Sequence, residues 1–166
     1  DLLATVARGD GAIVLSFQNA LIFGEDVSAI DYFYNQGVRM FALTHMGHND
    51  FADSSRPLFN AATGEREVTA EHGGLSSKGV AAVGRFNALG AIIDVSQLST
   101  AATLQVLAQS TAPVVASHSN ARALTDVSRN LSDREIRRIA AGEGVVHVAP
   151  FAGYLFDSND LVILLK

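Results

Sequence analysis

The stretch 113-PVVASH-118 decides the fold prediction, because a continuous apolar run stops there on a histidine. Runs of this β-branched kind are typical of strands that are covered on both faces of a parallel sheet. Three other runs stop on a polar residue in the same way, and a fifth precedes Phe151. The other four are 12-AIVLSF-17 before Gln18, 38-VRMFALT-44 before His45, 91-AIIDVS-96 before Gln97, and 144-GVVHVAP-150.

Helical periodicity fills the gaps between these runs. It predicts helices over 27–36, 77–89, 99–110 and 132–141, the last with a capping-box pattern of Ser132 and Glu135. This alternation predicts right-handed crossovers and a parallel sheet. Residues 46–74 form an exceptionally long connection, which in a compact domain is usually functional or disordered. The apolar stretch 161–165 could begin a further element.

Five parallel strands are compatible with an open doubly wound sheet or with part of a (β/α)8 barrel. No G-x-G-x-x-G follows a strand and no Walker lysine is present, so nucleotide binding is disfavoured. Their absence favours the barrel over the open sheet. We therefore expect residues 1–166 to form a single incomplete α/β barrel domain with about five βα units. The remaining strands are expected from polypeptide outside these residues or from a second chain, as in a homodimer, because open sheet edges are a liability.

Composition excludes several classes of protein. The chain is 48% hydrophobic and 17% charged with a net charge of −5 and no basic stripe, which disfavours nucleic-acid binding. No apolar run approaches the roughly 20 residues that span a bilayer. The absence of cysteine excludes disulfides and thiolate zinc sites. The start at Asp1 looks processed, so we expect a periplasmic or extracytoplasmic location if a signal was removed and a cytoplasmic one otherwise.

The residues at the strand ends are the candidates for chemistry. Functional groups gather at the carboxyl ends of parallel strands, so Gln18, His45, Gln97 and His118 are expected to share one rim. Neutral imidazole is a common metal ligand, whereas amide oxygens are weak zinc ligands and suit hydrogen bonding better. Arg129 could bind a carboxylate in a bidentate manner.

For other polar residues a structural or solvent-exposed role competes with a functional role. Asp94 lies inside an apolar strand and needs a partner, so a structural role is favoured over a catalytic one. His147, inside a strand, is expected to be structural, and His72, in a glycine-rich loop, is expected to be solvated. His48 and Asp50 form an H-x-D pair that could chelate a metal, but it lies beyond the strand end.

Four segments together make the chain resemble the membrane (renal) dipeptidase family of zinc metallopeptidases. They occur in the family's order and cover most of residues 37–154. They are GVRMFALTHMGHNDFADSS, GLSSKGVAAVGRFNALGAIIDVSQLS, PVVASHSNARALTDVSRNLSDREI and GVVHVAPFAGYL.

The resemblance implies a (β/α)8 barrel with two zinc ions at its mouth and hydrolysis of small peptides. It implies that His45 contacts the substrate and the tetrahedral intermediate, and that His118 is a zinc ligand. It further implies that Arg129 binds the substrate carboxylate and that Tyr154 lines the substrate pocket. His48 and Asp50 then belong to the second-strand loop and are not ligands.

Two residues depart from the family pattern. The family has a bridging glutamate where Gln18 stands and a histidine zinc ligand where Gln97 stands. Its H-x-D pair is expected before Asp1, and a later aspartate after Lys166. A neutral amide in place of a bridging carboxylate removes the charge that holds two dications close together, so we expect the zinc centre to be weak or absent.

Two hypotheses therefore remain open. In the first, the protein is a metal-dependent dipeptidase-like hydrolase of small peptides. In the second, it is a divergent family member that binds or modifies a peptide-derived metabolite without two-zinc hydrolysis. A purely structural module has no positive support.

Overall fold

The computed structural model describes residues 2–24, 26–60 and 62–155. Its main element is a five-stranded sheet in the order β1-β2-β5-β6-β7, and every neighbouring pair is parallel. The stretch 113–118 that decided the fold prediction forms most of the fourth strand in this order. The strands are β1 (Leu15–Gln18), β2 (Val38–Ala42), β5 (Ile92–Asp94), β6 (Val115–Ser119) and β7 (Val145–Val148).

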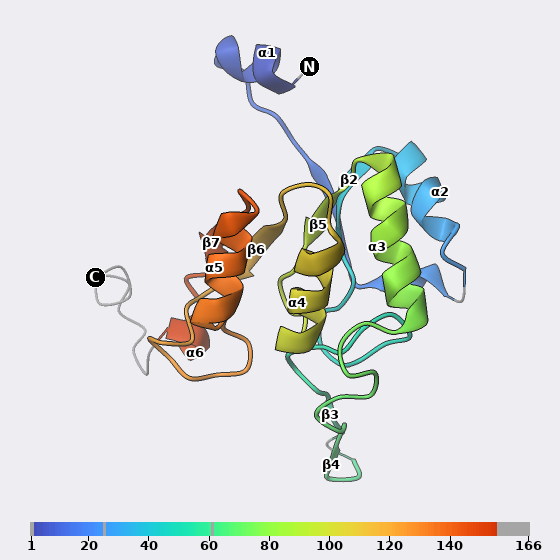
Figure 1. Ribbon diagram of the computed structural model, residues 1–166, viewed down its shortest axis with the longest axis vertical. Helices are drawn as coiled ribbons and strands as arrows, with labels where there is room; N and C mark the ends of the chain where they lie inside the picture. Colours follow the sequence, from blue (N-terminus) through green and yellow to red (C-terminus); the bar gives the residue numbers. More distant parts are fainter. Residues whose placement is uncertain (1, 25, 61, 156–166) are drawn as a thin grey trace.

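Helices line one face of this sheet, and three of them stand side by side across the front of Figure 1 (α3, α4 and α5), with α2 next to α3. The predicted alternation of strands and helices is confirmed. The helical segments are α1 (Leu2–Ala7), the 3-10 helix η1 (Ala20–Phe23), α2 (Ala29–Asn35), α3 (Ser77–Leu89), α4 (Thr100–Gln109), α5 (Asp133–Ala141) and α6 (Ala152–Leu155).

Serine caps fix the starts of the three front helices. Ser76, Ser99 and Ser132 each accept a hydrogen bond from a backbone N–H in the first turn. The predicted capping box is present, because the Glu135 carboxylate also accepts the backbone N–H of Ser132 at 2.8 Å. Each cap satisfies N–H groups that the helix leaves without an internal partner.

Several short elements were not predicted from the sequence. They are α1, η1, α6 and a small antiparallel hairpin of β3 (Phe59–Asn60) and β4 (Glu65–Arg66) within the long connection. Within the described residues the helices line one face of the sheet, and the covering of its other face stays a prediction for the full-length protein. Side chains of β1 and β7 are mostly exposed, whereas β2, β5 and β6 carry the buried positions. The stretch 161–165 lies outside the described residues.

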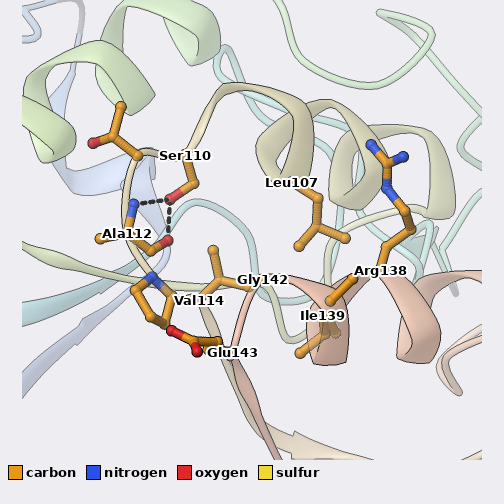
Figure 2. Close-up of a pocket in the computed structure, with 11 residues that line it drawn as sticks. Leu107, Ser110, Ala112, Val114, Arg138, Ile139, Gly142 and Glu143 are labelled. Atoms are coloured by element: carbon orange, nitrogen blue, oxygen red, sulfur yellow. Dashed lines mark hydrogen bonds between the residues drawn. The ribbon is translucent and has the colours of Figure 1, made fainter.

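A cavity of about 380 Å³ opens at the amino ends of β6 and β7, between α4 and α5. Figure 2 shows Leu107 and Ile139 on one side of it and Ser110 and Ala112 on the other, with Arg138 at its edge. This cavity lies at the end of the sheet opposite to the predicted rim, since it is lined by the connections that enter the strands. It contains none of the predicted site residues.

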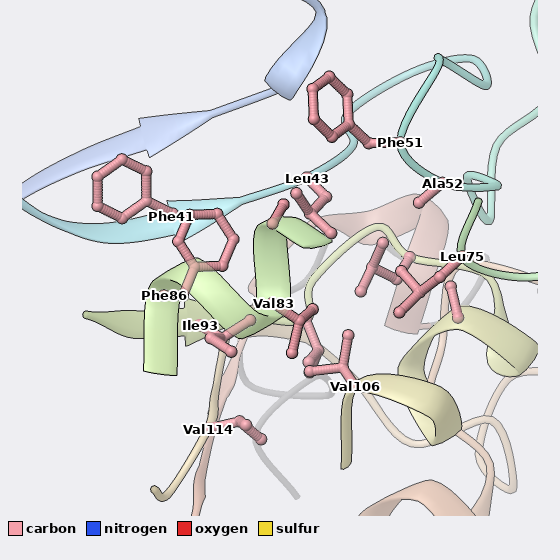
Figure 3. Packing of buried hydrophobic residues seen from close by; sticks show 14 of the residues in the cluster. Phe41, Leu43, Phe51, Ala52, Leu75, Val83, Phe86, Ile93, Val106 and Val114 are labelled. Atoms are coloured by element: carbon pink, nitrogen blue, oxygen red, sulfur yellow. The ribbon is translucent and has the colours of Figure 1, made fainter. Parts of the chain in front are cut away.

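The hydrophobic core lies between the sheet and the helices. Phe41 stacks on Phe86 of α3 with ring centroids 5.0 Å apart, and Val106 of α4 is fully buried in the same cluster (Figure 3). Phe51 and Leu75 extend the core under the long connection after β2. Residues 51–55 of that connection are therefore packed into the domain, whereas the β3–β4 hairpin projects from it (Figure 1).

Alanine substitution at two glycines of α3 is expected to change stability in opposite directions. A Cβ on Gly79 would lie 2.0 Å from the carbonyl oxygen of Phe51, whereas a Cβ on Gly84 would meet nothing within 4 Å. We expect Gly79→Ala to destabilise the full-length protein by about 1–3 kcal/mol through overpacking. Gly84→Ala is expected to stabilise it by about 0.5–1 kcal/mol, because alanine loses less backbone entropy in a helix. Urea unfolding of both variants checks this pair, and equal midpoints would contradict the packing.

Candidate functional site

Strand register brings the predicted rim together. Gln18 pairs with Ala42, Ala42 with Asp94, and Asp94 with Val115, so the strands end within a few residues of one another. The polar residues that follow or end the strands therefore project from one edge of the sheet, as expected for parallel strands.

His118 is the centre of this edge. Its Nε2 atom lies 3.1 Å from the Nε2 atom of Gln18 and 3.2 Å from the Nε2 atom of Gln97. Three of the four predicted rim residues are thus in direct contact, although Gln18 is separated from His118 by 100 positions in the chain. Gln97 is buried and has a left-handed backbone with φ 71°.

A chain of hydrogen bonds fixes the tautomer of His118. The Ser117 hydroxyl donates its single proton to the carboxylate of Asp94, which also accepts the N–H groups of Ser117 and Ser96. The same hydroxyl oxygen lies 2.7 Å from Nδ1 of His118, so Nδ1 must carry the proton that it accepts. The lone pair of His118 is therefore on Nε2, where the amide N–H groups of the two glutamines donate to it.

Electrostatics keep His118 neutral. Burial lowers the pKa of His118, and the positive charge of Arg129 and the proximity of His45 lower it further, while Asp94 opposes the shift. His45, the fourth rim residue, follows β2, and its carbonyl accepts the Ser54 hydroxyl at 2.6 Å. Its imidazole is half-buried on the same side as His118.

Arg129 is buried next to His118. It is 4% exposed, donates to the Ser119 hydroxyl at 3.1 Å, and donates to the carbonyl oxygen of His118. Its guanidinium lies 5.4 Å from the ring centroid of Tyr154, and its buried Nε–H has no partner among the described residues. Burial lowers the pKa of Arg129, and Tyr154 is the largest influence in the opposite direction. The two predicted substrate-binding residues are thus neighbours.

Buried polar side chains order the connection between β2 and α3. His48 accepts the N–H of Ser54 through Nδ1 at 3.0 Å and donates from Nε2 to the Val68 carbonyl at 2.7 Å, so both ring nitrogens are used. Asn49 donates to the Leu43 carbonyl at 2.8 Å. Asp50 instead pairs with Lys78 at the surface, so the H-x-D pair forms no chelate. His72 and His147 are exposed, as expected for His72.

Asp53 accepts several hydrogen bonds within this connection, and from these contacts we expect the stability of the protein to depend on pH in the acidic range. The carboxylate is fully buried and accepts the N–H groups of Glu71, His72 and Gly74 at 2.7–3.3 Å. Burial alone would raise the pKa of Asp53, but these N–H groups and nearby His48 outweigh it and lower that pKa. A lowered pKa means that the contribution is complete above the unfolded value of about 3.9 and is lost as pH falls through the folded value.

We expect Asp53→Asn to destabilise the full-length protein by about 2–4 kcal/mol at pH 7, because one amide oxygen cannot accept all of these N–H groups. The difference from the natural protein should shrink as pH falls below about 4. Urea unfolding between pH 7 and pH 3 measures both effects. The matched control is Asp50→Asn, whose solvent-exposed ion pair with Lys78 is expected to contribute little to stability. A loss at Asp53 no larger than that at Asp50 would contradict this role.

The described residues do not fit a two-zinc centre. Among residues 2–24, 26–60 and 62–155, no group of three or more His, Asp or Glu side chains lies close enough together to hold a metal ion. The donors that meet at the edge of the sheet are one imidazole nitrogen and two amide groups, and the amides already donate to that nitrogen. This set forms a satisfied hydrogen-bonded cluster apart from the buried Gln97 Oε1, which has no partner in the described structure.

Comparison with known proteins identifies the family. The sequence model described as membrane dipeptidase, peptidase family M19, matches residues 1–163. The chain belongs to this family. The M19 relatives include dipeptidase aclJ of Aspergillus oryzae, which is 35% identical over 131 residues, and dipeptidase tcpJ of Claviceps purpurea, which is 31% identical over 149 residues. These alignments cover 79% and 90% of this chain but 29% and 33% of the relatives, so the chain spans about a third of their length.

Solved M19-type structures share the fold. The probable dipeptidase PvdM from Pseudomonas aeruginosa is 49% identical with a TM-score of 0.85, over 94% of this chain and 38% of its own. A metallopeptidase from Rhodobacter sphaeroides, liganded with a phosphinate mimic of the dipeptide L-Ala-D-Ala, is 26% identical with a TM-score of 0.81, over 94% of this chain and 43% of its own. The five parallel strands are therefore part of the barrel of M19 dipeptidases, and the predicted fold class is confirmed. No helix in the described part of this M19 chain is long and apolar enough to cross a bilayer.

Sequence reasoning missed three participants in the site. Ser117 and Ser119 flank His118 on β6 and orient His118 and Arg129. The alternation Ser-His-Ser beside a buried aspartate was the available signal for both. Arg56 donates to the Tyr154 hydroxyl at 2.7 Å, across 98 positions of sequence, and no local pattern marks it.

Proposed function

We propose that the full-length protein is a dipeptidase-like enzyme that acts on a dipeptide or another small molecule derived from a peptide. Arg129 carries this proposal, because it is a buried guanidinium beside Tyr154 whose Nε–H has no partner among the described residues, and such a group is suited to hold a carboxylate. Membership of the M19 family, and the dipeptide mimic bound to the Rhodobacter sphaeroides relative, support a substrate of this class.

In this proposal some residues bind the substrate and others position the binding residues. Arg129 binds the terminal carboxylate, and Tyr154 forms the adjoining wall. His45, half-buried at the end of β2, would donate a hydrogen bond to an oxygen that gains negative charge during reaction. Asp94 and Ser117 keep the Nδ1 proton of His118 in place, so that Nε2 faces the edge of the sheet.

A second candidate is a divergent member that binds or modifies a peptide-derived metabolite without two-zinc hydrolysis. The contacts of Gln18 and Gln97 with His118 favour it, because two neutral amides stand where zinc chemistry requires anionic or imidazole donors. In that case Gln18, Gln97 and His118 would act as polar binding groups. We place them at the metal positions of the family and expect zinc to be held weakly there.

Turnover and binding by the purified full-length protein test the two candidates. The probes are Ala-Ala, its L,D isomer and the C-terminal amide of each, with release of free alanine as the readout for hydrolysis and calorimetry as the readout for binding. Hydrolysis of the free acids supports the first candidate. Binding of the acids without hydrolysis supports the second, and the absence of both would overturn a peptide site.

A further inference from the structure

Two arginines from different parts of the chain flank Tyr154. Arg56, in the connection after β2, donates to the Tyr154 hydroxyl at 2.7 Å, and its guanidinium carbon lies 5.9 Å from the ring centroid. The guanidinium carbon of Arg129 lies 5.4 Å from the same centroid. The two cations are close enough that Arg56 lowers the pKa of Arg129.

No acidic side chain forms an ion pair with either arginine within the described structure, although the negative charge of Asp94 raises the pKa of Arg129. The ion pairs found among the described residues involve other groups, and neither Arg56 nor Arg129 takes part in one. Glu67, the acid that belongs to the neighbouring hairpin region, accepts the N–H groups of His48 and Leu58 instead. Like charges that are partly desolvated and unpaired repel each other, and an anion placed between them would relieve that repulsion.

A cavity of about 260 Å³ opens beside this pair. Arg56 and Arg66 both line it, and so do Met46 and Ser128, which are the direct sequence neighbours of His45 and Arg129. Arg66 is exposed, its guanidinium carbon lies 5.6 Å from the centroid of the Phe59 ring, and it takes part in no ion pair found among the described residues. Arg129 and Tyr154 do not line this cavity, but Arg56 joins it to them, because Arg56 lines the cavity and donates to the Tyr154 hydroxyl.

We propose that Arg56 and Arg66 bind a second carboxylate of the substrate, next to the terminal carboxylate held by Arg129. The protein would thus prefer peptides that end in Asp or Glu. This inference rests on the proposed function and narrows its substrate class. A carboxylate side chain fits both the volume of the cavity and the donors that line it, since guanidinium groups match carboxylates in shape and charge. An apolar side chain in the same place would desolvate two cations without pairing them.

Calorimetric binding of Ala-Glu and Ala-Gln to the full-length protein tests this inference, because the two peptides differ only in the charge of the last side chain. We expect Ala-Glu to bind at least about tenfold more tightly than Ala-Gln, because hydrogen bonds between guanidinium groups and a carboxylate are charge-assisted. Arg56→Gln and Arg66→Gln should each reduce this ratio towards one. The control is Arg138→Gln, which removes an equal charge at the opposite end of the sheet and should keep the ratio.

The outcomes separate this inference from the proposed function. Equal affinity of the natural protein for both peptides, or a ratio that survives both Arg56→Gln and Arg66→Gln, overturns the acidic subsite and leaves the peptide site standing. Failure of every dipeptide to bind overturns both. Arg66 does not touch Tyr154, so Arg66→Gln remains informative even if Arg56→Gln disturbs the packing of that ring. A ratio that falls in Arg66→Gln, with no hydrolysis of either peptide, supports the subsite and refutes only the hydrolase.

Discussion

Replacing Gln18 by Glu and Gln97 by His together is expected to raise the zinc affinity of the full-length protein by at least about 10–100-fold. Mutation of residues that only orient a metal ligand already changes metal affinity by this factor. Here a carboxylate and an imidazole, which are zinc ligands themselves, would replace two amides. Both side chains already reach Nε2 of His118, so the new donors would point to the same place. The left-handed backbone at position 97 tolerates histidine better than most residues.

A zinc titration with a competing chromogenic chelator measures this gain. The matched control is Gln36→Glu with Gln109→His, which makes the same chemical changes at the ends of α2 and α4, away from the rim. A double variant that binds no more zinc than this control would contradict the assignment of positions 18 and 97 to the metal edge. Dipeptide hydrolysis that appears together with zinc would show that ligand loss alone had silenced the site.

Replacing Arg129 by Gln is expected to weaken dipeptide binding by about 2–5 kcal/mol, or at least about 30-fold. This is the usual cost of removing one partner of a buried, hydrogen-bonded charge pair. The dipeptide affinity of Arg129→Lys should lie between those of the natural protein and Arg129→Gln, because lysine keeps the charge but loses the planar pair of donors. Calorimetry with Ala-Ala measures the loss, and Arg134→Gln, an exposed arginine on α5, is the control.

The C-terminal amide of Ala-Ala separates recognition from a structural effect of Arg129. The natural protein should bind the amide much more weakly than the acid, and Arg129→Gln should bind acid and amide alike. A variant that loses affinity for both peptides equally, with a lowered melting temperature, would show that Arg129 serves only to support Ser119 and the carbonyl of His118.

Much of the fold was predictable because long apolar runs and capped amphipathic helices carry strong local signals. Ser77–Leu89 forms a helix with the bounds expected from its periodicity, and Ser132 and Glu135 form the expected capping box. The elements that were missed are short. The β3–β4 hairpin pairs two residues with two, and η1 is a single 3-10 helix, so neither repeats a pattern long enough to detect.

The site was predictable as a set of strand ends and unpredictable as a network. Parallel topology alone predicted that Gln18, Gln97 and His118 would gather, and they do. The tautomer of His118 depends on one hydroxyl proton of Ser117, whose partner Asp94 lies on a neighbouring strand. The contact between Arg56 and Tyr154 joins a loop to a short helix 98 positions away, and only the folded chain brings them together.

The central claim is that the substrate-binding side of an M19 dipeptidase site persists here while its metal-binding side has changed. Zinc content of the full-length protein, purified without chelator and measured by mass spectrometry, tests this most directly. The Gln18→Glu, Gln97→His double variant is its positive control. We predict that the natural protein retains less than one zinc per chain and that the double variant retains more. Two tightly held zinc ions per natural chain would contradict the claim.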